Sequence, residues 1–158
     1  MERNTYFCKS WFRAKKRPTE IWSEDQARVA HKEGWSYTVL VGSIEQPYCF
    51  LEVTEKAVGV GFLDKFLRES LSYSFQEVEP GMLFLTMATY REFEGDTDKV
   101  VSGTSYIFKQ DGAVVVRREF FDPHKLETAT STADVAANYS PKPEFGQYED
   151  LIRVERNS

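Results

Sequence analysis

Residues 100–121 read VVSGTSYIFKQDGAVVVRREFF and contain the clearest fold signal in the chain. Two runs rich in β-branched and aromatic residues flank Gln110-Asp111-Gly112, and an Asp-Gly pair in that position is typical of a β-hairpin. The sequence therefore predicts strands over 100–109 and 113–121. Both are longer than the usual strand of about 5–6 residues, which favours a curved sheet.

The residues before this hairpin continue the strand pattern. Residues 71–76 alternate apolar with polar side chains, as a half-buried strand does. Pro80-Gly81 marks a turn, and residues 82–94 form a long predicted strand after it. Three consecutive strands joined by short turns predict an antiparallel meander. The side chains expected in its core are Leu71, Tyr73, Phe75, Leu83, Leu85, Ile107, Val114 and Val116.

Shorter strands are expected on both sides of the meander. A period of two residues predicts strands over 35–41, 48–53 and 57–60. Residues 125–134 are rich in Thr and Ser, and one interpretation of this segment is a further strand.

Helix signals are found at three places. Ser23 and Gln26 form a capping box, and Gly34 stands where a helix ends, which predicts a helix over 24–33. Helical spacing of apolar side chains predicts two shorter helices, over 62–69 and 145–152. The predicted class is α+β, a curved antiparallel sheet of six or more strands with a few short helices.

Length and charge limit the functional classes. The 158 residues are expected to form a single domain with a net charge of −5. Residues 1–18 form a basic arm, because six of them are Lys or Arg and only Glu2 is acidic. The acidic remainder argues against nucleic acid as the partner. The run from Arg13 to Arg17 is either a small nucleic-acid patch or a solvated edge strand or arm whose positive charge blocks edge pairing. The second interpretation is favoured.

The sequence contains no apolar run of the length of a membrane span and no signal-peptide core. We therefore expect a cytoplasmic protein that does not bind membranes. Cys8 and Cys49 are expected to be reduced, buried thiols. Because no Cys/His cluster has metal-ligand spacing, we expect no metal and no cofactor.

Residues that often carry catalysis are few. His31 falls in the last turn of a predicted helix, where a protonated imidazole favours the helix dipole, and His124 falls in a predicted loop. A nucleophilic pair of Cys49 and His124 has no local support. Gly59-Val60-Gly61 lacks the third glycine of a dinucleotide fingerprint and the lysine of a P-loop, so a bulge or tight bend is expected there. No catalytic residue is assigned.

Acidic residues alternate with others in the segment between two long predicted strands. Three roles are open for these carboxylates: solvated acids of a hairpin loop, part of a protein-binding edge, or ligands of a metal ion. The EF-hand pattern fails, because the sixth and twelfth positions from Asp96 are Val101 and Ile107. Two neighbouring aromatic residues are typical of interface anchors. The candidate partner-binding residues are Tyr90, Glu92, Phe93, Glu94, Asp96 and Asp98.

Three stretches resemble a functional class of small bacterial proteins. Residues 84–96 (FLTMATYREFEGD), 103–108 (GTSYIF) and 143–152 (PEFGQYEDLI) are similar to immunity proteins encoded beside polymorphic toxins, as in contact-dependent inhibition, Rhs or type VI systems. The resemblance implies a protein of bacterial competition that binds and neutralises a cognate toxin, often a basic effector domain. Immunity proteins have many unrelated folds and share no catalytic residues. The resemblance therefore implies no particular fold and no catalytic residue for this chain. An acidic body would steer a basic partner into rapid association.

Two other functions stay open at the level of sequence. A calycin-like antiparallel cup would bind a small ligand, with Tyr73, Tyr90 or Tyr106 lining its cavity. An enzyme would use carboxylates such as Glu77 and Glu92. A large apolar cavity would favour the cup, and carboxylates of strongly raised pKa in a cleft would favour the enzyme.

Overall fold

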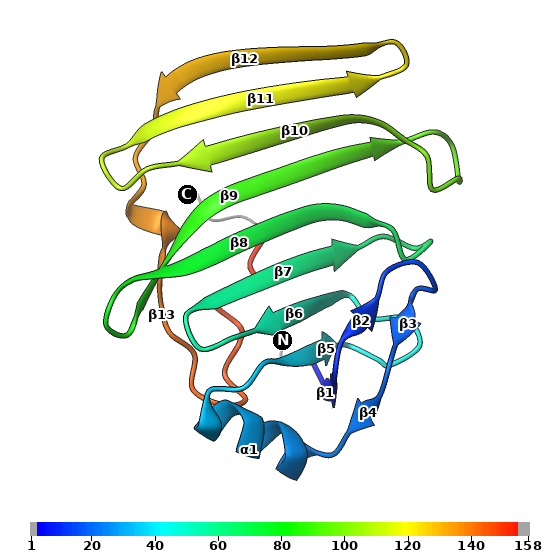
Figure 1. The fold of residues 1–158 in the computed structure, drawn as a ribbon, viewed down its shortest axis with the longest axis vertical. Coiled ribbons are helices and arrows are strands. Elements are labelled where there is room, and N and C mark those ends of the chain that lie inside the picture. Colours follow the sequence, from blue (N-terminus) through cyan, green and yellow to red (C-terminus); the bar gives the residue numbers. More distant parts are fainter. Residues whose placement is uncertain (1–2, 155–158) are drawn as a thin grey trace.

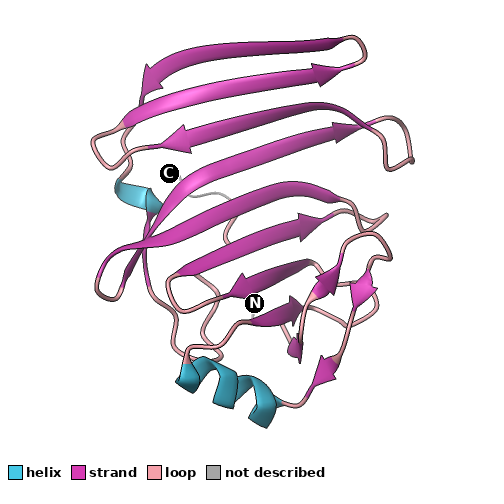
Figure 2. Ribbon diagram, viewed as in Figure 1, coloured by secondary structure: helices cyan, strands magenta, loops and turns pink. Residues whose placement is uncertain are grey.

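The computed structural model describes residues 3–154, and a large antiparallel sheet dominates them (Figure 1; Figure 2). Within these residues, eleven strands form one sheet and two more form a small separate sheet. The strands are β1 (Thr5–Cys8), β2 (Trp11–Phe12), β3 (Arg17–Pro18), β4 (Ile21–Trp22), β5 (Tyr37–Val41), β6 (Cys49–Val53), β7 (Ala57–Leu63), β8 (Glu69–Glu79), β9 (Met82–Phe93), β10 (Val100–Phe108), β11 (Ala113–Phe121), β12 (His124–Thr132) and β13 (Tyr139–Pro141). The predicted antiparallel sheet of six or more strands is confirmed.

The strands follow one another across the sheet in chain order. From β5 to β12 every strand pairs with its sequence neighbour, and β1 and then β4 continue the sheet beyond β5. The predicted hairpin joins β10 and β11, with Phe108 opposite Val114. Gly112 closes its turn at φ 93°, and an added Cβ would lie 2.9 Å from the carbonyl oxygen of Ala133. The meander is therefore confirmed, and the Thr-rich segment is its last strand, β12.

The first predicted helix is confirmed as α1 (Glu24–Glu33). The Ser23 side chain accepts a hydrogen bond from the Gln26 backbone, the Gln26 side chain accepts one from Ser23, and Gly34 ends the helix at φ 76°. Ala27 and Ala30 are buried against the sheet. Among the described residues, no helix has the length and apolar character that a membrane span requires.

The other two predicted helices are wrong, so the described residues contain α1 and only one short 3-10 helix, η1 (Ala136–Asn138). Phe62 belongs to β7, where it pairs with Cys49 and Leu71. The Asp64 carboxylate then accepts hydrogen bonds from the backbone of Phe66 and Arg68, which closes a turn instead of a helix. Side chains of Ser, Asn and Asp often compete with helices in this way.

Residues 145–152 form successive turns for a different reason. Pro141 and Pro143 precede the segment, and Gly146 has φ 89°, which lies outside the helical region. Tyr148 and Leu151 are nevertheless buried in the core. The helical spacing of the apolar side chains arises because separate turns face the same core.

The core lies under the first half of the sheet, which is covered on both faces. Side chains from α1 and residues 145–152 pack on one face with Val39, Leu51 and Tyr73. The β2–β3 hairpin covers the other face, where Trp11 contacts Phe50. Figure 1 shows α1 and the hairpin at this end of the sheet, far from β12.

Six of the eight side chains predicted for the core are buried: Leu71, Tyr73, Phe75, Leu83, Leu85 and Val114. The prediction is wrong for Ile107 and Val116, which are half-buried. Both lie in β10 and β11, where the sheet continues beyond the layers that cover β5 to β9. An alternating pattern identifies a strand, but it does not show whether a second layer covers that strand.

Candidate functional site

The outer part of the sheet is the most exposed regular structure in the protein. Every residue of β12 is exposed, and every residue of β10 is half-buried. Figure 1 shows these strands with β11 at the far end of the molecule. Antiparallel sheets commonly leave one face in water, whereas a regular domain covers the other face with a second layer. Apart from Val114, which is buried near the start of β11, the side chains on both faces of these strands are at least partly exposed, which makes them candidates for contact with a partner.

One of these faces carries two tyrosines, and we call it the Tyr90 face. Pairing across the strands places Tyr90 beside Thr104, then Arg118 and then Glu127. The Tyr90 side chain is 45% exposed, and its ring meets the ring of Tyr106 edge-on at 5.9 Å between centroids. Aromatic pairs in this geometry offer a rigid, largely apolar surface with polar hydroxyls.

The predicted site residues divide between the two faces. Glu92 lies two residues from Tyr90 on the same face and accepts a hydrogen bond from Ser102 at 3.3 Å. Phe93 lies on the opposite face, where the guanidinium carbon of Arg68 is 4.5 Å from its ring centroid. Because side chains alternate along a strand, consecutive residues of one strand do not share one surface.

The acidic loop after β9 is held in place by cations. Arg68 donates hydrogen bonds to the carbonyl oxygens of Gly95 at 2.9 Å and Thr97 at 2.7 Å. Asp98 forms an ion pair with Lys16 at 2.7 Å.

Glu94 is paired with Lys99 at 3.6 Å, so internal cations partly neutralise two of the predicted acids, Glu94 and Asp98. Within residues 3–154, no cation forms an ion pair with Asp96. Asp96 is therefore the loop carboxylate with the most charge available to a partner.

A cleft of about 400 Å³ lies between the β2–β3 hairpin and this loop. Its cations are Arg13, Lys16, Arg68 and Arg91, and each forms an ion pair with a carboxylate. Arg13 contacts Glu52 at 2.8 Å, and this hydrogen bond is the main cause of the raised pKa of Arg13. Because each cation is already paired with a carboxylate, the cleft is not suited to bind an anion. Its ion pairs instead join segments that are distant in the sequence. The sequence shows the basic run but not its acidic partners, which lie far along the chain.

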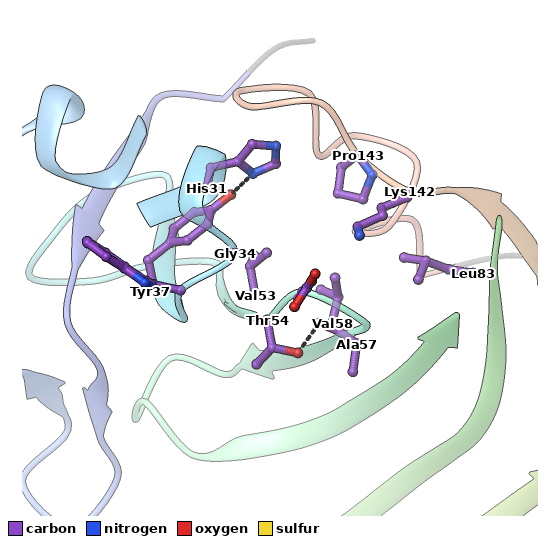
Figure 3. Close-up of a pocket in the computed structure, with 12 residues that line it drawn as sticks. His31, Gly34, Tyr37, Val53, Thr54, Ala57, Val58, Leu83, Lys142 and Pro143 are labelled. Carbon is purple, nitrogen blue, oxygen red and sulfur yellow. Dashed lines mark hydrogen bonds between the residues drawn. The ribbon is translucent and has the colours of Figure 1, made fainter. Parts of the chain in front are cut away.

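A second cavity, of about 150 Å³, lies between α1, β6 and the segment after β13 (Figure 3). Figure 3 shows His31 and Tyr37 on one side of it and Lys142 and Leu83 on the other. His31 Nδ1 lies 2.8 Å from the Tyr37 hydroxyl oxygen, which lies 2.9 Å from that of Tyr148. Burial, and then the charge of Lys142, lower the pKa of His31. His31 lies in the last turn of α1 as predicted, but this environment disfavours the protonated imidazole that would complement the helix dipole.

This cavity gives little room for a ligand. Sites for small molecules usually enclose about 300–1,000 Å³. The three tyrosines expected to line a cup do not line this cavity. Tyr73 is buried and donates a hydrogen bond to the carbonyl oxygen of Val154, whereas Tyr90 and Tyr106 lie on the accessible sheet face.

The residues considered for catalysis are far apart. Cys49 lies on β6 and His124 begins β12, six strand positions across the sheet, or about 29 Å at 4.8 Å per strand. Burial raises the pKa of Cys8 to about 11 and that of Cys49 to about 12, so both thiols stay protonated at neutral pH. They are free and buried, as expected.

The two candidate carboxylates are also separated. Glu77 pairs with Leu83 at the start of β9, and Glu92 lies nine residues further along that strand, about 30 Å away. Lys142 forms an ion pair with Glu77 at 3.6 Å. Among the described residues, no group of three or more His, Cys, Asp or Glu side chains is arranged to hold a metal ion.

Comparison with protein-family models, curated protein sequences and solved structures gives no significant match.

Proposed function

We propose that this protein is an immunity protein that binds a cognate toxin domain on the Tyr90 face and neutralises it. The observation that carries the proposal is the accessible outer sheet, on which exposed Tyr90 packs against half-buried Tyr106. Tyr is enriched among the residues that dominate binding energy in protein interfaces. The three stretches that resemble immunity proteins support the same class of function, and two of them contribute Tyr90 and Tyr106.

The proposed partner is a basic domain. The net charge of the chain is −5, Glu92 adds an exposed carboxylate on the Tyr90 face, and Asp96 adds another in the loop after β9. Long-range attraction of this kind raises the rate of association, whereas aromatic contacts mainly slow dissociation. The proposal includes a cytoplasmic location and no nucleic-acid or membrane partner.

Curvature of the sheet is also part of the proposal. Register shifts interrupt the pairing of β8 with β9 and of β9 with β10. Bulges bend a strand and increase its local twist. A sheet curved around the Tyr90 face would wrap a convex surface of the toxin and bury more of both aromatic rings.

The test is binding to the toxin encoded by the neighbouring gene, measured by calorimetry with purified proteins. Tyr90→Ala combined with Tyr106→Ala is expected to weaken binding by about 2–4 kcal/mol, as loss of interface anchors does. Phe121→Ala is the matched control, because Phe121 is also 45% exposed but lies on the opposite face.

The proposal predicts a large loss for the tyrosine variant and little change for the control. A folded tyrosine variant that keeps the wild-type Kd would exclude the Tyr90 face as the binding site. Failure of the wild-type protein to bind that toxin, or to protect cells from it, would remove the immunity function itself.

A further inference from the structure

The outer edge of β12 is unpaired along nine residues. His124–Thr132 pairs with β11 on one side, and nothing within residues 3–154 pairs with the other side. Figure 1 shows β12 as the outermost strand of the sheet. A free edge of this length presents a row of backbone donors and acceptors that template another strand. The opposite end of the sheet is β4, which has only two residues.

Few of the usual protections against pairing are present on this edge. Natural sheets block edges with charges, prolines, bulges or very short strands. The charged residues of β12 are Lys125 and Glu127, and residues 128–132 are only Thr, Ala and Ser. The pairing of β12 with β11 runs without a register shift, so no bulge turns the strand away.

The two charged residues make the edge complementary to itself. When two copies of β12 run antiparallel about a two-fold axis at Leu126, Lys125 of one copy stands opposite Glu127 of the other. The same pair occurs twice, because the axis relates the two strands. Opposite charges directly across a pair of strands stabilise it by roughly 0.2–1 kcal/mol each.

The neighbouring strand extends this pattern. Arg118 of β11 stands opposite Glu127 within one copy, on the same face of the sheet. Across the joined edge the row would read Arg118, Glu127 and then Lys125 of the second copy, so the signs alternate. On the other face the Leu126 side chain, 47% exposed in the single chain, would meet Leu126 of the second copy.

We propose that the protein forms a two-fold dimer in which the β12 strands pair edge to edge about Leu126. The two outer sheets then become one continuous sheet, and each Tyr90 face stays accessible. A register centred on Thr128 would pair all nine residues but place Lys125 opposite Ser131 and Glu127 opposite Ala129. The Thr128 register would form more backbone hydrogen bonds than the Leu126 register but no ion pair between the two strands. The charge pattern therefore favours the Leu126 register. This inference does not depend on the proposed function.

Charge reversal tests the dimer without any toxin present. Lys125→Glu or Glu127→Lys alone places like charges opposite each other at both pairs, which should raise the dimer dissociation constant at least about tenfold. The double variant, Lys125→Glu with Glu127→Lys, restores opposite charges and should return the constant close to the wild-type value. Sedimentation equilibrium over a range of protein concentrations measures all four proteins. A wild-type protein that stays monomeric, or a double variant as weak as the single ones, would overturn the proposal.

Two cysteine variants test the register. Leu126→Cys places two thiols opposite each other at the proposed axis, whereas Thr128→Cys does so only in the longer register. The two positions share one strand and one face, and the native thiols of Cys8 and Cys49 are buried, which makes the variants a matched pair. Under mild oxidation, Leu126→Cys should give a covalent dimer faster than Thr128→Cys. The reverse order would exclude the Leu126 register, and no covalent dimer from either would exclude self-pairing of β12.

Discussion

The hydroxyl oxygens of Tyr37 and Tyr148 lie 2.9 Å apart in the core, although the residues are 111 positions apart in the chain. Tyr37 lies on β5, and Tyr148 lies in the turns that close the same face of the sheet. Burial raises the pKa of both phenols, so they stay protonated and act as neutral hydrogen-bond partners. This contact joins the turns of residues 145–152 to β5.

We expect Tyr148→Phe to lower the free energy of unfolding by about 0.5–1.5 kcal/mol, the net value of one buried hydrogen bond. Tyr148→Ala should cost about 3–5 kcal/mol, because it also leaves a cavity. Urea denaturation measures both values. Tyr90→Phe is the control, since its hydroxyl lies on an accessible face and its loss should change stability by less than about 0.5 kcal/mol. Equal effects of Tyr148→Phe and Tyr90→Phe would contradict the role of the buried contact.

Arg68 should control the order of the acidic loop. Its guanidinium bonds to the Asp64 carboxylate at 2.8 Å and to two loop carbonyls, so Arg68→Ala removes all three contacts. We expect a stability loss of about 2–3 kcal/mol and faster amide exchange in residues 94–99. Hydrogen exchange followed by mass spectrometry measures the second effect. Lys65→Ala, an exposed cation on the same turn, should leave both quantities near the wild-type values.

The two glycines of β7 should respond differently to the same substitution. An added Cβ on Gly61 would lie 2.4 Å from the Phe50 ring and 2.5 Å from a Glu69 carboxylate oxygen, whereas on Gly59 the nearest atom is 3.8 Å away. Gly61→Ala should therefore cost about 1–3 kcal/mol through overpacking. Gly59→Ala should be neutral or slightly stabilising, because alanine restricts the unfolded chain. Thermal unfolding of the two variants checks the difference, and equal melting temperatures would contradict it.

The stability of the protein should depend on the protonation of His31. Its pKa is lower in the folded protein than the unfolded value of about 6.5, because burial and then Lys142 disfavour the charged ring. The unfolded state therefore binds more protons as the pH falls through 6.5 towards the folded pKa, and stability is lost in that window. His31→Gln should reduce the loss of unfolding free energy between pH 7 and pH 5. Urea titrations at both pH values measure it, and an unchanged pH dependence would contradict the assignment.

Most of the sheet could be predicted from the sequence, because hairpin turns and the alternation of side chains are local properties. The sequence predicts no bounds for the four N-terminal strands, because β2, β3 and β4 have only two residues each and β1 has four, too few for a repeating pattern. The turn after β7 was mistaken for a helix, because apolar spacing does not reveal that the Asp64 side chain replaces helical hydrogen bonds.

The candidate site was harder to predict, because it depends on pairing between strands. Tyr90 and Glu92 were identified from the sequence, but their neighbour Arg118 is brought beside them only by the register of three strands. The pairing of Lys16 with Asp98 joins residues 82 positions apart. Contacts of this kind follow from the tertiary fold and leave no periodic signal in the chain.

The position of Tyr148 and Leu151 in the core has a consequence for how the chain folds during its synthesis on the ribosome. The strands from β5 to β9 emerge in the order in which they pair, so each can join the sheet as soon as it is available. The layer that covers them includes residues 145–152, which are made after all of these strands. The growing chain therefore carries a partly uncovered apolar sheet face until residues 145–152 have been made and can pack on it.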